Sequence, residues 1–208
     1  MSTLTIDADA VVTAGSTDAA APLLVLLHGF GSNEGDLIGL APYLPAAYAV
    51  ASLPAPLALG PGQRAWFPIA TPGRPDVATV DAAADAVLAW LDVVHPDRAV
   101  SLLGFSQGGA LVTQLFRRAP QRFVAGVVLA GFSVDTVTPG DAELAERRPP
   151  IFYGRGTVDR VIAPDATRRT VEWLPEHSTL TMRVYAGLAH AISPDELEDV
   201  AAFLRATL

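Results

Sequence analysis

The chain of 208 residues contains no cysteine and no lysine, and its 14 basic residues are all arginine. The absence of cysteine excludes disulfides, thiolate metal sites and a cysteine nucleophile. The absence of lysine excludes Schiff-base chemistry and a lysine general base. Nucleophilic or acid–base chemistry in this protein must therefore use other side chains.

The chain also lacks blocks of like charge and long apolar runs. Its net charge of −8 disfavours phosphate backbones and anionic lipid, so we expect no nucleic-acid and no membrane partner. The longest apolar run, at 19–27, contains Pro22 and is too short to span a bilayer. The first residues show neither a basic start nor an apolar region that would indicate a signal peptide, so we expect a cytoplasmic protein.

The order of apolar runs and helical patterns predicts an α/β fold in a single domain over 1–208. Strands that are apolar on both faces are typical of a buried, mostly parallel sheet, whose sites lie at the carboxyl ends of the strands. The expected strands are 3–7, 11–15, 23–29, 48–53, 99–105, 124–132, 150–154 and 179–187. The expected helices are 77–95, 107–119, 164–174 and 193–208.

Two long stretches, 54–75 and 133–150, fit neither pattern and are expected to be irregular. Loops of this length in a compact domain are usually functional or mobile. The first stretch carries apolar side chains that a solvated loop would not tolerate, so we expect it to fold back over a pocket. These side chains are Leu57, Leu59, Trp66, Phe67 and Ile69.

The sequence Gly-Phe-Ser occurs twice, at 104–106 and at 131–133, each time after an apolar run. The first copy continues as "GFSQGG", which fits G-x-S-x-G between a strand and a helix, the pattern of a sharp turn that exposes a nucleophilic serine. The second copy continues as "VDTVT", which lacks the second glycine and a following helical pattern. Ser106 is therefore the predicted nucleophile, and Ser133 is interpreted as pocket wall or loop.

A serine nucleophile needs a histidine base and an acid that orients the base. His190 follows a strand, has small neighbours and comes after every candidate acid, as the order Ser…Asp…His in this type of fold requires. His28 is interpreted instead as fixing the loop that follows it. Asp159 fits the acid by position, and Asp135 stays an alternative because it also follows a strand end.

Backbone N–H groups are expected to bind the oxyanion. The stretch "HGFGS" at 28–32 follows a strand and has the form that supplies one such donor, and the residue after the nucleophile, Gln107, should supply the second. Each donor of this kind typically contributes about 3–4 kcal/mol to transition-state stabilisation.

Five segments together resemble the phospholipase/carboxylesterase family of α/β-hydrolases, which includes bacterial carboxylesterases and acyl-protein thioesterases. They are "LLVLLHGFGSNEGDL", "RAWFPI", "LLGFSQGGAL", "GTVDRVIAP" and "YAGLAHAIS". The resemblance covers roughly residues 20–206. It implies an α/β-hydrolase fold with helices on both faces of the sheet and no large cap domain. It implies Ser106 as nucleophile, Asp159 as acid and His190 as base, with the N–H groups of Phe30 and Gln107 as oxyanion hole. The expected pocket residues are Leu57, Trp66, Phe67, Phe132 and Ile162.

The sequence thus predicts a serine carboxylic ester hydrolase that needs no cofactor and no metal. Its expected substrate is a small molecule, a short to medium acyl ester or thioester. Two alternatives stay open: a binding protein that has kept the fold without turnover, and an acyltransferase or peptidase with the same triad. The oligomeric state is not defined by the sequence, and a homodimer is one option.

Overall fold

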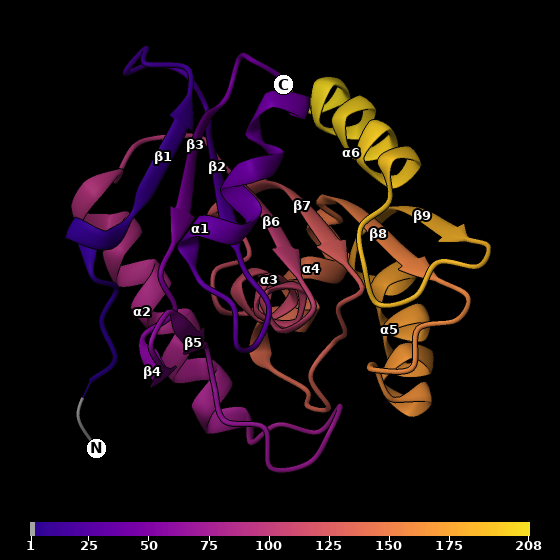
Figure 1. The fold of residues 1–208 in the computed structure, drawn as a ribbon. Helices are drawn as coiled ribbons and strands as arrows, with labels where there is room; N and C mark the ends of the chain where they lie inside the picture. Colours follow the sequence, from indigo (N-terminus) through magenta and orange to yellow (C-terminus); the bar gives the residue numbers. More distant parts are fainter. Residues whose placement is uncertain (1–2) are drawn as a thin grey trace.

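The computed structural model describes residues 3–208, and its centre is a seven-stranded sheet (Figure 1). The strand order is β1-β3-β2-β6-β7-β8-β9. Strand β1 pairs antiparallel with β3, and every other pair in this sheet is parallel. The strands are β1 (Val12–Gly15), β2 (Leu23–Leu27), β3 (Ala49–Leu53), β6 (Val100–Phe105), β7 (Phe123–Leu129), β8 (Pro150–Gly156) and β9 (Thr179–Tyr185). The predicted α/β fold with a mostly parallel sheet is confirmed.

The middle of the sheet is buried on both faces because its central strands are mostly apolar, and β2 is apolar at every position. Successive side chains of a strand point to opposite faces. In β2, Leu23, Val25 and Leu27 accordingly pack into one hydrophobic core, and Leu24 and Leu26 pack into another. All five side chains are at most 2% exposed. The apolar run of β2 is thus explained by two layers of helices rather than one.

The helices form one layer on each face of the sheet (Figure 1). Helices α2 (Val77–Val94), α3 (Gln107–Arg118), α4 (Pro139–Arg147) and α5 (Pro164–His177) contribute to the first core. Helix α1 (Glu34–Leu37), the 3-10 helix η2 (Ile38–Tyr43) and helix α6 (Pro194–Ala206) cover the other face. A short 3-10 helix, η1 (Ala8–Ala10), precedes β1.

Several elements differ from the sequence prediction. Residues 3–7 form no strand, and α5 continues through Pro175 to His177, so the missing N–H of Pro175 removes only one hydrogen bond, two residues before the helix ends. The stretch 133–150, expected to be irregular, contains α4. The stretch 54–75 contains a hairpin of β4 (Leu57–Gly60) and β5 (Gln63–Ala65).

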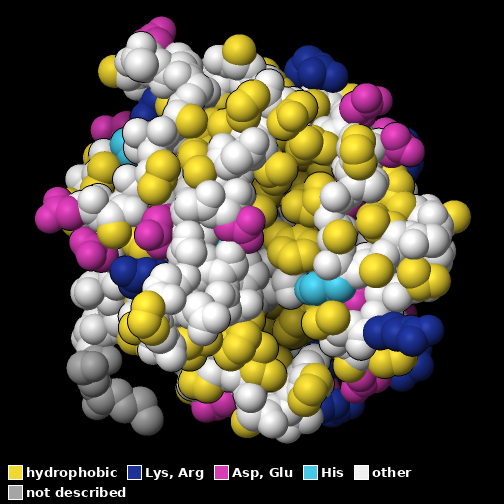
Figure 2. Space-filling view, viewed as in Figure 1, with side chains coloured by type: hydrophobic (Ala, Val, Ile, Leu, Met, Phe, Trp, Pro, Cys, Tyr) yellow, Lys and Arg dark blue, Asp and Glu magenta, His cyan; other side chains and the backbone are white. Residues whose placement is uncertain are grey.

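The face shown in Figure 2 exposes apolar side chains in a hollow, and charged side chains lie mainly around its rim. A groove between η2 and α6 is lined by apolar residues including Leu40, Tyr43, Ile192 and Leu197. Within residues 3–208, no helix combines the length and the apolar character needed to cross a membrane.

Candidate active site

Ser106 occupies the turn between β6 and α3, with φ 55° and ψ −113°. A non-glycine residue at positive φ is strained and persists only where the surrounding structure fixes it. The conformation of Ser106 is fixed by close backbone packing around the two flanking glycines, where there is no room for a side chain. A Cβ on Gly104 would lie 2.2 Å from the Gly108 oxygen, and a Cβ on Gly108 would lie 1.9 Å from the Leu27 oxygen. The sequence pattern G-x-S-x-G is thus a direct consequence of close backbone packing.

Ser106, His190 and Asp159 form a continuous chain of hydrogen bonds. His190 Nε2 lies 2.9 Å from Ser106 Oγ, and His190 Nδ1 lies 2.8 Å from Asp159 Oδ2. Because the ionised carboxylate can only accept, Nδ1–H donates to Asp159 and Nε2 is left to accept from the serine hydroxyl. The three residues come from the end of β6, the loop after β9 and the loop after β8.

The carboxylate of Asp159 is held ionised by its surroundings. Burial by itself would raise the pKa of this carboxyl. Hydrogen bonds from the His190 ring and from the N–H groups of Val161 and Ile162 outweigh burial, so the pKa of Asp159 is lowered overall. Oδ1 accepts from both backbone groups, which leaves Oδ2 facing the imidazole.

The alternative acid, Asp135, does not contact His190 and pairs instead with two arginines. Its side chain is 51% exposed and pairs with Arg74 at 3.2 Å and with Arg169 at 3.8 Å. Ser133, beside it in the chain, is fully buried, and its N–H donates to Thr170 Oγ1. The structure therefore brings His190 together with Ser106 and Asp159, and not with the second Gly-Phe-Ser segment.

His28 is fully buried, and both of its ring nitrogens contact backbone. Nε2 accepts from the Ala55 N–H at 3.3 Å, so Nδ1 carries the proton and donates to the Gly29 oxygen at 2.8 Å. Burial lowers the pKa of His28, which keeps the ring neutral. This geometry agrees with the interpretation that His28 fixes the loop after β2.

The backbone N–H groups of Phe30 and Gln107, the two predicted oxyanion donors, have no hydrogen-bond acceptor in the described part of the chain. Gln107 is the first residue of α3, where helical N–H groups have no intrahelical partner. Phe30 lies in the loop after β2. In the same loop, a Cβ on Gly29 would lie 3.5 Å from Ser106 Cβ. Both predicted donors thus come from segments that adjoin the serine.

The side chain of Gln107 has a structural role that the sequence did not indicate. Its Oε1 accepts from the Trp66 N–H at 2.9 Å, and its Nε2 donates to the Phe67 oxygen at 2.7 Å. The amide therefore ties the segment after β5 to the start of α3. The signal in the sequence that could have shown this link is a glutamine directly after the candidate nucleophile, at the start of a helix.

A cavity of about 170 Å³ opens beside Ser106. Of the five expected pocket residues, Phe67, Phe132 and Ile162 line it, whereas Leu57 and Trp66 do not. Trp66 is fully buried beneath the site, where its indole N–H donates to the His28 oxygen at 2.9 Å. Ile69, named with the apolar side chains of the stretch 54–75, and Gln107, the predicted oxyanion donor, also line the cavity, whereas Thr71, Pro72, Gly73, Pro75 and Val161 were not individually predicted. The prediction that the stretch 54–75 folds back over a pocket thus agrees with the structure for its second half.

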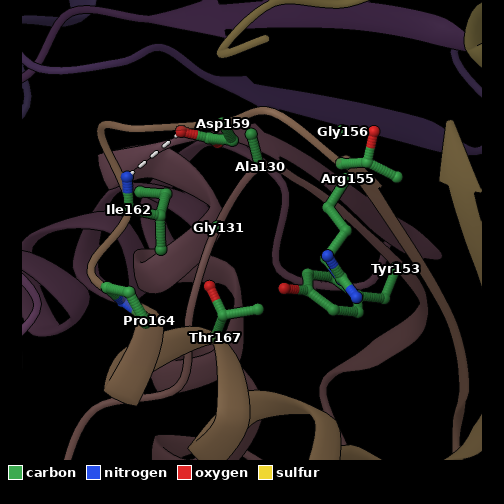
Figure 3. Close-up of a pocket in the computed structure, with 10 residues that line it drawn as sticks. Ala130, Gly131, Tyr153, Arg155, Gly156, Asp159, Ile162, Pro164 and Thr167 are labelled. Atoms are coloured by element: carbon green, nitrogen blue, oxygen red, sulfur yellow. Dashed lines mark hydrogen bonds between the residues drawn. The ribbon is translucent and has the colours of Figure 1, made fainter. Parts of the chain in front are cut away.

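A second cavity, of about 210 Å³, adjoins Asp159 and is lined largely by the ends of β7 and β8 and the start of α5 (Figure 3). The side chains of Tyr153, Arg155 and Thr167 border it, and burial raises the pKa of Tyr153 to about 12. The dashed line in Figure 3 marks the bond from the Ile162 N–H to Asp159. Among residues 3–208, no cluster of three or more His, Asp or Glu side chains is arranged to hold a metal ion.

A mostly parallel sheet with helices on both faces, and a serine at a strained turn between a strand and a helix, defines an α/β-hydrolase. The chain belongs to the phospholipase/carboxylesterase family, whose model matches residues 8–208. Members of this family hydrolyse carboxylic ester bonds, and the chain is an enzyme of this class.

Individual relatives agree with this assignment. Acyl-protein thioesterase 1 of Saccharomyces cerevisiae is 27% identical over 223 residues, which cover 94% of this chain and 96% of that enzyme. The crystal structure of a Bacillus cereus carboxylesterase superposes with a TM-score of 0.82 at 20% identity, over 95% of this chain and 94% of that one. The crystal structure of esterase PE8 gives a TM-score of 0.80 at 24% identity, over 99% and 100% of the two chains. These two structures support the fold.

Proposed function

We propose that the enzyme is a serine carboxylesterase in which Ser106 is the nucleophile, His190 the general base and Asp159 the residue that orients the base. The observation that carries the proposal is the unbroken chain of hydrogen bonds from Asp159 through His190 to Ser106 Oγ, at 2.8 and 2.9 Å. A serine hydroxyl is a weak nucleophile unless an adjacent base takes its proton.

The reaction proceeds in two halves. Ser106 Oγ attacks the acyl carbonyl while its proton passes to His190 Nε2, and His190 then gives this proton to the leaving alcohol or thiol. The product of the first half is an acyl-serine. A water molecule, deprotonated by the same nitrogen, attacks the acyl-serine, and collapse of the second tetrahedral intermediate releases the carboxylic acid and restores Ser106. Asp159 stays ionised throughout and stabilises the imidazolium.

The backbone N–H groups of Phe30 and Gln107 bind the oxyanion in this proposal. They lie on two different segments next to Ser106 and have no other acceptor within residues 3–208. The Gln107 N–H also belongs to the N-terminus of α3, where the helix dipole favours negative charge. Loss of one such donor typically lowers kcat by about 10²–10³.

The substrate class follows from the cavity beside Ser106. Its volume of about 170 Å³ lies below the range of about 300–1,000 Å³ that is typical of pockets for drug-sized ligands. Its wall is formed mainly by apolar side chains, among them Phe67, Phe132 and Ile162. We therefore propose short to medium acyl esters or thioesters, in line with the carboxylesterase and acyl-protein thioesterase names of the relatives.

The test compares two serine variants with p-nitrophenyl butyrate as substrate. Ser106→Ala should lower kcat by about 10⁴ or more, as expected when a triad member is lost. Ser133→Ala, which alters the other Gly-Phe-Ser segment, should keep kcat within about twofold of the wild type. A fluorophosphonate should label the wild type and Ser133→Ala but not Ser106→Ala. Wild-type turnover by Ser106→Ala would contradict the proposal.

A further inference from the structure

The segment that leads into α2 folds into a tight turn over the cavity at Ser106. The Arg74 N–H donates to the Thr71 oxygen at 3.1 Å, which closes a four-residue turn. Pro72 is its second residue, and Gly73, at φ +72°, is its third, as in a type II turn. We call residues 69–75 the flap.

The flap forms one wall of the cavity. Ile69, Thr71, Pro72, Gly73 and Pro75 line it, together with Ser106, Phe132 and Ile162. An acyl chain that outgrows the cavity on the side of this wall must displace the flap.

Arg74 fastens the flap to two carboxylates on other segments of the chain. Its Nη2 lies 3.0 Å from Asp165 Oδ2, and Nε donates to the same oxygen at 3.1 Å. Its Nη1 donates to Asp135 Oδ2 at 3.2 Å. Asp165 belongs to the first turn of α5, and Asp135 follows the segment that contributes Phe132 to the cavity. One guanidinium thus joins the flap to α5 and to the segment that follows Phe132.

A second arginine, Arg169, also holds the flap in place. Arg169 donates from Nη2 to the Gly73 oxygen at 2.8 Å and from Nε to the Ser133 oxygen at 2.9 Å. The glycine itself is seated closely on α5: a Cβ there would lie 2.9 Å from the Ala166 Cβ and 3.0 Å from the Ala163 Cβ. The flap is therefore held at its tip, in the position in which it lines the cavity.

We infer that Arg74 is a specificity-determining residue: its ion pairs to Asp135 and Asp165 latch the flap and thereby limit the length of the acyl group that Ser106 receives. This inference rests on the proposed function. The side chains of Arg74, Asp135 and Asp165 are 57%, 51% and 34% exposed. Exposed ion pairs contribute little and are screened by salt, so this latch opens for a longer chain at a modest cost.

The test is an acyl-chain-length series of p-nitrophenyl esters from acetate to dodecanoate, reported as kcat/KM. In Arg74→Gln the ratio for octanoate over acetate should rise about fivefold, the effect expected when up to about 1 kcal/mol of ion pairing is lost. Arg168→Gln is the matched control, since Arg168 lies on α5, is exposed and has no ion pair within the described residues. Its ratio should equal that of the wild type.

Ionic strength gives an independent readout. Between about 0.05 and 1 M NaCl the Debye length falls to about 3 Å, so the octanoate-to-acetate ratio of the wild type and of Arg168→Gln should rise. The ratio of Arg74→Gln should rise less, because its latch is already absent. Asp135→Asn, which removes one partner only, should give an intermediate ratio at low salt.

The outcomes separate the latch from the chemistry. A ratio in Arg74→Gln within twofold of the wild type, or an equal rise in Arg168→Gln, would overturn the latch while leaving the triad intact. Full activity of Ser106→Ala on every ester would instead overturn the proposed function, whatever Arg74 does.

Discussion

Gly108 lies so close to Leu27 that a Cβ on the glycine would be 1.9 Å from the leucine carbonyl oxygen. Leu27 is the last residue of β2, and Gly108 is the second residue of α3. This contact seats the start of α3 directly on the strand end that precedes the loop of Phe30. The two segments proposed to supply the oxyanion donors are thereby fixed relative to each other and to Ser106.

We expect Gly108→Ala to destabilise the protein by about 3 kcal/mol or more, because neither the strand end nor the helix can move without disturbing the packed sheet. Urea denaturation would measure the loss. Gly39→Ala is the matched control, since a Cβ on Gly39 meets nothing within 4 Å and its φ is not positive. This control should change stability by no more than about 1 kcal/mol. A loss below about 1 kcal/mol in Gly108→Ala would show that the elbow has room to relax.

Asp159→Asn should lower kcat by about 10³–10⁴ with little change in KM for a short ester. An asparagine amide cannot stabilise the imidazolium, and it favours the wrong tautomer of His190 if its NH₂ faces Nδ1. The comparison is Asp135→Asn, which removes the alternative acid. Its kcat for p-nitrophenyl acetate should stay within about twofold of the wild type. The assignment of the acid would be reversed if the two variants exchanged these effects.

The sequence predicted the sheet and the sharp turn at Ser106 because both depend on local patterns. Strand β2 is a continuous apolar run, β6 is apolar except for Ser101, and the glycines around Ser106 mark a turn that only glycine permits. Helix α4 was missed because the β-branched residues at 134 and 136–138 disfavour a helix directly after Ser133, and the stretch 133–150 was interpreted as irregular. Yet the helix begins immediately after them, with a capping box between Thr138 and Asp141 that the sequence contains.

The residues that line the pocket were less predictable, because an apolar side chain in a loop can pack into the core or line a cavity, and its sequence context is the same in both cases. Trp66 was expected in the pocket, yet it is fully buried and bonded to the His28 oxygen. Part of the lining comes instead from the turn around Pro72 and Gly73. Its position depends on bonds of Arg74 to Asp135 and of Arg169 to the Gly73 oxygen, which join residues 61 and 96 positions apart in the chain. No local pattern encodes such pairings.

Gln107→Leu should lower stability by about 2 kcal/mol or more, although it keeps the backbone N–H proposed for the oxyanion hole. The change leaves the Trp66 N–H and the Phe67 oxygen unpaired in a buried region, at about 1–3 kcal/mol each. Since Phe67 lines the cavity, KM for p-nitrophenyl butyrate should rise more than kcat falls.

Gln114→Leu provides the control for this prediction. Gln114 is a buried glutamine of the same helix, but its amide donates to the half-buried Asp81, away from the cavity. Its KM should be unchanged. An equal rise of KM in both variants would mean that Gln107 acts through helix stability and not through the cavity wall.

Glu196, in the first turn of α6, should make the enzyme less stable as the pH rises toward neutrality. Its side chain is 1% exposed, neither carboxyl oxygen has a hydrogen-bond partner within residues 3–208, and Oε1 lies against Gly154. Burial raises the pKa of Glu196 from 4.5 to about 7. The folded state therefore binds a proton that the unfolded state has already released between these two values.

The sign of the effect follows from this difference in proton binding. Stability attributable to Glu196 is complete below about pH 4.5, falls as the pH rises to about 7 and stays low above it. Glu196→Gln, which is neutral at every pH, should match the wild type near pH 4.5 and exceed its free energy of unfolding at pH 8. Urea denaturation at both pH values measures this difference. Glu198→Gln, at an exposed position of the same helix, should leave the pH dependence unchanged. If Glu196→Gln shows the same fall in stability between pH 4.5 and 7 as the wild type, the buried carboxyl is not its source.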